Sequence, residues 1–200
     1  SIAQFSNLNE AYDVALEAPS HLYNAYLSGD MSSIVFQEMR ESRSLAYGVG
    51  ARFLVPSRKK YPFVYVADIS TQTDKMMDAI NAFDEIINQM PQSEAAFNIA
   101  KENLIAYHRT QRMLGARVIN YYQNLKKLGF DCSVDPRKAE FEKVQQFTLQ
   151  DVIDFQKEVI KDRKYVIGIL GTEKDLDMKA LTPEKYGKVE RVSLEDIFGY

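Results

Sequence analysis

The stretch 36–47 holds the residues of this sequence that are best placed to do chemistry. Arg40 lies at the end of a helical pattern, and Tyr47 follows it in the stretch 45–50, whose pattern indicates a strand. A helix that leads directly into a strand holds a long cation and a phenol at one junction, where a rigid scaffold often presents binding groups. The spacing alone also allows an ordinary interpretation. An arginine is favoured near a helix C-terminus by the helix dipole, and a tyrosine packs well in a strand.

The two histidines are the other residues that could support catalysis. Peptidases that bind zinc through a helix use two histidines and a glutamate at fixed spacing, as in His-x-x-Glu-His. Leu-Tyr-Asn-Ala follows His21 and Arg-Thr-Gln-Arg follows His108, so neither neighbourhood has a second ligand or the required glutamate. A single histidine on a helix usually has a structural role or is solvated. We therefore expect no metal site and no self-sufficient hydrolysis in this chain.

The patterns around the junction predict an α+β fold, with helices packed on one face of a mostly antiparallel sheet. The helix over 31–42 is expected to bury four apolar residues at helical spacing, namely Met31, Ile34, Val35 and Met39. Strands are predicted over 1–8, 45–55, 61–71 and 164–170, with a weak one over 188–192. Further helices are predicted over 10–27, 73–90, 93–114, 116–128 and 148–160, with a short one from 136.

Composition limits the classes of function. The 200 residues suffice for one domain with a sizeable core, and a charged fraction of 26% is typical of a globular chain. A net charge of -3 argues against a nucleic-acid partner, since nucleic-acid binding needs a basic face. No apolar run is long enough to span a bilayer. The one cysteine, Cys132, cannot form a disulfide within the chain.

The segment from Leu22 to Tyr47 resembles the C-terminal-type domain of the M16 family, the inverted-motif zinc peptidases related to insulysin, pitrilysin and the mitochondrial processing peptidase. That family has an Asn-x-x-Leu-Gly-Gly stretch, a short helix ending in Leu-Arg-Glu, and then Gly-Leu-Ala-Tyr. Ser44 stands where the family usually has glycine. The matching residues are Asn24, Leu27, Gly29, Ser33, Phe36, Glu38, Arg40, Glu41, Leu45, Ala46 and Tyr47.

This resemblance implies a role for the pair at the junction. In M16 peptidases two homologous halves face each other across a closed chamber. One half carries zinc and the other contributes an arginine and a tyrosine seven residues apart. Arg40 would hold a peptide carbonyl or carboxylate, and Tyr47 would donate to the oxyanion of the tetrahedral intermediate. Arg43 has no such role and is expected to be a surface residue.

The resemblance also implies partners and leaves alternatives open. We expect residues 1–200 to form one non-zinc M16 domain, a fragment of a larger peptidase, with zinc held by a separate homologous domain in the same polypeptide or in another chain. Peptide substrate would bind between the two. The alternatives are a catalytically inactive M16-like scaffold or assembly subunit and, as a weaker interpretation, a free-standing peptide-binding domain. Retention of Arg40 and Tyr47 favours the peptidase, because a scaffold has no need of the pair.

Overall fold

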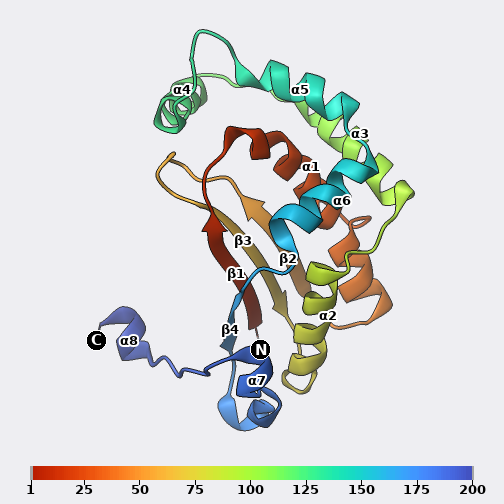
Figure 1. Cartoon of the computed structure of the whole chain (residues 1–200), viewed down its shortest axis with the longest axis vertical. Coiled ribbons are helices and arrows are strands. Elements are labelled where there is room, and N and C mark those ends of the chain that lie inside the picture. The colour runs from red at the N-terminus through yellow and green to blue at the C-terminus, as the bar shows by residue number, and fades with distance from the viewer. Residues whose placement is uncertain (1, 200) are drawn as a thin grey trace.

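A computed structural model describes residues 2–199 and confirms the α+β prediction. Four strands form an antiparallel sheet in the order β2-β3-β1-β4. The central strands are β1 (Ile2–Glu10) and β3 (Phe63–Ser70), while β2 (Gly48–Leu54) and β4 (Val166–Leu170) form the two edges. Helices cover one face of this sheet (Figure 1), as the sequence predicted.

The helices fall into three groups. Those that pack on the sheet are α1 (Glu17–Ser28), α2 (Met76–Asn88) and α6 (Leu149–Phe155). A second group, α3 (Glu94–Thr110), α4 (Ala116–Leu128) and α5 (Pro136–Gln146), stands at one end of the molecule (Figure 1). The short helices α7 (Pro183–Tyr186) and α8 (Leu194–Phe198) lie at the other end. The remaining turns are π-helical over Phe36–Ser42 and Gln156–Ile160, and 3-10 helical over Val14–Leu16, Thr73–Lys75, Glu173–Asp175 and Met178–Ala180.

A group of buried aromatic rings joins the helices to the sheet. Phe53 of β2 stacks on Phe63 at 4.8 Å between ring centroids, and it forms a T-shaped pair with Phe155 of α6 at 5.3 Å. Tyr23 of α1 contacts the same Phe155 ring at 4.9 Å. Aromatic pairs of this kind stabilise a core beyond the area that they bury. They therefore fix how α1 and α6 sit on the sheet.

Several helix ends form where local chemistry predicts them. The Ser93 side chain accepts a hydrogen bond from Ala96 N, which caps α3. Thr148 and Asp151 form a capping box at the start of α6. Gly129 ends α4 in a left-handed conformation, with φ of 85°, that favours glycine.

Other boundaries differ from the predictions. The helix predicted over 10–27 is shorter in the structure. Glu10 is the last residue of β1, and α1 starts only at Glu17. Met31 is 71% exposed instead of buried, because the turn around Asp30 precedes the helical residues and leaves Met31 outside them. Residues 188–192 form no strand, since no neighbouring strand lies beside them among the described residues. Within residues 2–199, no helix has the length and apolar character that crossing a membrane requires.

Candidate functional site

The junction between the π-helical turn 36–42 and β2 is fixed by two backbone hydrogen bonds. Leu45 N donates to Met39 O at 2.9 Å, and Tyr47 N donates to Ser70 O at 3.0 Å. Between them, Ser44 has φ of 51°, in the left-handed region that glycine adopts more readily than other residues. Glycine, which the resemblance leads us to expect at this place, would adopt the same conformation without the cost of a Cβ atom.

Arg40 and Tyr47 both lie on the surface of this junction. The Tyr47 side chain is 80% exposed, and β2 begins only at the next residue. Arg40 is exposed and its guanidinium lies over the Phe36 ring, 5.0 Å from the centroid. Within residues 2–199, neither side chain forms a hydrogen bond or an ion pair. Packing in the core therefore does not account for Tyr47, and both polar groups are available to a ligand.

Arg43 attaches this junction to the body of the domain. Its guanidinium lies 2.8 Å from a Glu85 carboxylate oxygen on α2 and 3.7 Å from one of Glu38. Lys75 also reaches back, donating to the Ser44 carbonyl at 3.3 Å. These contacts are partly exposed, so each contributes little to stability, but together they tie the turn to α2.

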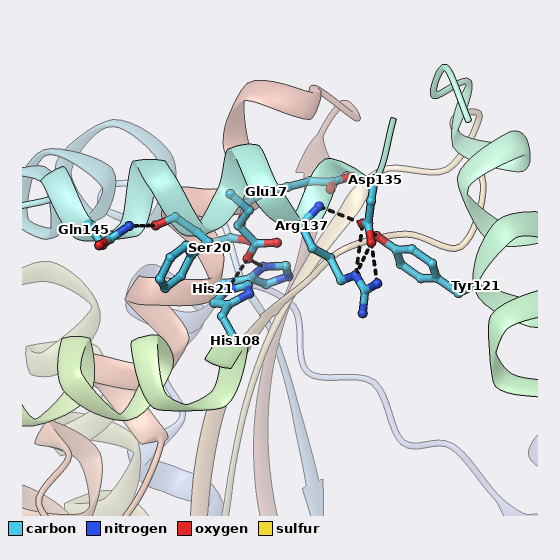
Figure 2. A network of polar contacts seen from close by, with 10 residues as sticks. Glu17, Ser20, His21, His108, Tyr121, Asp135, Arg137 and Gln145 are labelled. Carbon is cyan, nitrogen blue, oxygen red and sulfur yellow. Dashed lines mark hydrogen bonds and ion pairs between the residues drawn. The ribbon is translucent and has the colours of Figure 1, made fainter. Parts of the chain in front are cut away.

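A second polar group joins three helices, α1, α3 and α5 (Figure 2). His21 of α1 has Nδ1 at 2.5 Å from Oε1 of Glu140 on α5, and His108 of α3 has Nε2 at 3.5 Å from the same oxygen. The His108 side chain is only 8% exposed, and its Nε2 makes no hydrogen bond to any described residue. Both histidines therefore have a structural role, which the sequence allowed, but the sequence did not reveal that they share Glu140.

The shared carboxylate shifts the protonation of this group. Burial alone lowers the pKa of His21, but the hydrogen bond to Glu140 and its charge outweigh burial, so the pKa is raised. Burial alone raises the pKa of Glu140, but His21 first and then His108 outweigh it, and the pKa is lowered. The arrangement therefore favours a protonated His21 beside an ionised Glu140.

These residues do not form a metal centre in the structure. Among residues 2–199, no group of three or more His, Cys, Asp or Glu side chains is placed to hold a metal ion. The contact between His21 and Glu140 is direct and leaves no space for a cation between the two atoms. The contacts of Glu140 with the two histidines link α1, α3 and α5.

Comparison with known proteins places the chain in a family. A family model described as the peptidase M16 inactive domain matches residues 4–104. None of the curated proteins matches this sequence.

Similar solved structures share the fold at low sequence identity. A peptidase M16 inactive domain from Pseudomonas fluorescens is 19% identical with a TM-score of 0.65, over 83% of this chain and 39% of that one. A protein of Bordetella pertussis Tohama I assigned to the zinc proteases is 13% identical with a TM-score of 0.66, over 86% of this chain and 94% of that one. Pitrilysin is 14% identical with a TM-score of 0.55, over 83% of this chain and 18% of that one. The match therefore spans well under half of the Pseudomonas structure.

Proposed function

This chain belongs to the peptidase M16 inactive-domain family, and we propose that it is the substrate-binding, non-zinc half of an M16 zinc metallopeptidase. Residues 1–200 would form one domain of that peptidase and would hydrolyse peptides only together with a separate zinc-carrying M16 domain. The matched solved structures include a protein assigned to the zinc proteases, which supports this pairing. In such an enzyme zinc would be held by the partner domain and would supply activation of the attacking water.

One observation carries the proposal: Tyr47 presents an unbonded phenol, 80% exposed, at a junction that backbone hydrogen bonds hold in place. Folding gains nothing from such a side chain, whereas a ligand in a chamber would find a hydroxyl already positioned. Arg40 extends from the preceding turn with its guanidinium over Phe36, so its hydrogen-bond donors remain available.

The two side chains would act at different stages. The Arg40 guanidinium would bind a carbonyl or carboxylate of the peptide before reaction, because it carries a permanent charge and a planar set of donors. The Tyr47 hydroxyl would donate to the oxyanion, which exists only once water has attacked the peptide carbonyl. Binding of the ground state would therefore depend mainly on Arg40, and the chemical step mainly on Tyr47.

Site-specific crosslinking in the complete protein tests the placement of this surface. A benzoyl-phenylalanine introduced at position 47 should crosslink to bound peptide or to the zinc-carrying domain upon irradiation. The same probe at position 61, another exposed tyrosine outside the junction, is the control. If position 47 gives no more crosslink than position 61, the junction faces solvent and the domain acts as an M16-like scaffold.

A further inference from the structure

Positive charge gathers in one part of an otherwise acidic chain. Residues 103–130 contain no Asp or Glu, although the whole chain has 28 acidic against 25 basic residues. The cations of this stretch are Arg109, Arg112, Arg117, Lys126 and Lys127. This uneven distribution creates a local positive potential that the net charge of the chain conceals.

The fold turns part of this stretch into the wall of a groove. Helices α1, α3, α4 and α5 enclose a hollow of about 1120 Å³, which exceeds the roughly 300–1,000 Å³ typical of small-molecule sites. The pair His21 and His108 lines it together with Glu140, and Tyr121 and Arg137 line the side toward α4 (Figure 2). A groove of this size has room for a segment of peptide chain.

Most cations around the groove have no partner in the molecule. Arg137 is paired with Asp135, but Arg109, Arg112 and Arg117 form no ion pair with any residue in the range 2–199. Arg109 is held instead over the Phe141 ring, 5.8 Å from its centroid. Exposed guanidinium groups that have no carboxylate partner keep their donors available, so an anionic ligand in the hollow could pair with them.

An apolar hollow adjoins the groove, so a ligand that fills both needs an apolar group as well as negative charge. It measures about 450 Å³ and shares Arg112 and Arg137 with the groove. Its apolar lining includes exposed side chains of α4 and of the loops on either side, which are Leu114, Val118, Tyr122 and Val134. Large apolar side chains that stay exposed around a hollow indicate a binding surface.

We propose that this groove binds an acidic peptide segment that carries a large apolar side chain. Carboxylates of the peptide would pair with Arg109, Arg112 and Arg117, and the apolar side chain would enter the hollow beside Val118 and Val134. A peptide fits better than a nucleic acid, because a peptide can combine carboxylates for the arginines with an apolar side chain for the adjoining hollow. The groove also contains the carboxylates of Glu17, Asp135 and Glu140, so the acidic groups of the peptide would lie toward the arginines.

Fluorescence anisotropy with the chain alone tests this site. The probe is a short fluorescein-labelled peptide of Glu, Asp, Leu and Phe, and a matched peptide replaces the acids with Lys. Changing Arg109, Arg112 and Arg117 together to Gln should weaken Kd about tenfold, since three exposed ion pairs contribute a total near 1.4 kcal/mol. The control variant changes three exposed lysines away from the groove to Gln, namely Lys157, Lys174 and Lys179.

The expected results are binding of the acidic peptide only, weaker binding in added salt, and an unchanged Kd in the control variant. Val134→Ser should weaken binding of the peptide but not of a version with Ala in place of Leu and Phe. All three arginines are exposed, so the variant should keep its melting temperature. Equal Kd values for the groove and control variants, no binding of the acidic peptide, or tighter binding of a single-stranded oligonucleotide would each overturn the proposal. Because neither turnover nor the zinc-carrying domain is involved, these outcomes are independent of the proposed peptidase role.

Discussion

The junction with Arg40 and Tyr47 and the group around Glu140 are built in opposite ways. At the junction two side chains lie close in sequence, point outward and have no hydrogen-bond or ion-pair partner within residues 2–199. Around Glu140, His21 and His108 come from distant helices, and His108 is buried. Exposed groups without partners contribute little to folding and are free for a ligand, whereas a shared, half-buried carboxylate stabilises the packing of helices. Substitutions at the junction should therefore lower activity and leave stability unchanged. Substitutions around Glu140 should lower stability and leave activity unchanged.

The largest expected effect is on turnover at the junction. In the complete enzyme, Tyr47→Phe should lower kcat about a hundredfold and leave KM nearly unchanged, because the lost hydrogen bond forms only in the transition state. Steady-state kinetics would measure this, with Tyr61→Phe as the control. If Tyr47→Phe keeps full kcat, the junction has no catalytic role that separates it from the group around Glu140, and the scaffold interpretation is favoured.

Arg40→Ala should act mainly on substrate binding. Loss of a charge-assisted contact to ground-state peptide is expected to raise KM about tenfold with a smaller change in kcat. Arg52→Ala on β2 is the matched control, since Arg52 is also exposed. A thermal melt of each variant should show no shift. A collapse of the melting temperature in Arg40→Ala would show that the residue is structural.

Glu140→Gln should affect stability instead of turnover. Removing the carboxylate that both histidines share should cost about 1 kcal/mol and lower Tm by about 3 °C, a modest loss because the His21 side chain is 39% exposed. Glu142→Gln, an exposed neighbour on α5, should have no such effect. If kcat falls instead of Tm, the group around Glu140 belongs to the catalytic machinery.

The stability lost in Glu140→Gln should depend on pH. The pKa of His21 is raised above its ordinary value of 6.5, so its contribution is full below that pH and is lost as pH rises through the raised pKa. The pKa of Glu140 is lowered below 4.5, so its contribution is full above that pH and is lost as pH falls through the lowered pKa. The difference from the unsubstituted chain should therefore be largest between about pH 4.5 and 6.5. A difference that does not change toward pH 8 would contradict a protonated His21.

A smaller effect is expected at the corner of the junction. Ser44 has φ of 51°, and glycine adopts this conformation without the cost of a Cβ atom. Ser44→Gly should raise the free energy of unfolding by up to about 1 kcal/mol and leave kinetics unchanged. Chemical denaturation would measure it. A lower stability would indicate that the greater freedom of glycine in the unfolded chain dominates.

The last prediction is that the chain alone shows neither zinc binding nor peptidase activity. After dialysis the chain alone should hold no stoichiometric zinc and should cleave no fluorogenic peptide, because His21 already contacts Glu140 directly and no zinc motif is present in the sequence. Elemental analysis and a chelator-sensitive peptidase assay would check this. One zinc per chain that disappears in Glu140→Gln would show that the histidine group binds metal.

The sequence by itself determined what depends on neighbours along the chain. The caps at Ser93 and Thr148 follow from hydrogen bonds within a few residues. The role predicted for Arg40 and Tyr47 also rests on a short spacing, in the resemblance to M16 domains, and it stays a prediction. The α+β class followed from apolar periodicity, which a residue expresses whatever lies across the core from it.

Only the tertiary structure decided which distant residues meet. His21 and Glu140 are 119 positions apart, and their contact exists because α1 and α5 pack against each other. The unpaired arginines became the wall of a groove because α3, α4 and α5 enclose it. Residues 188–192 remained without strand structure for the same kind of reason, since a strand forms only where a partner offers its hydrogen bonds. Packing between elements, and not any local pattern, placed these groups.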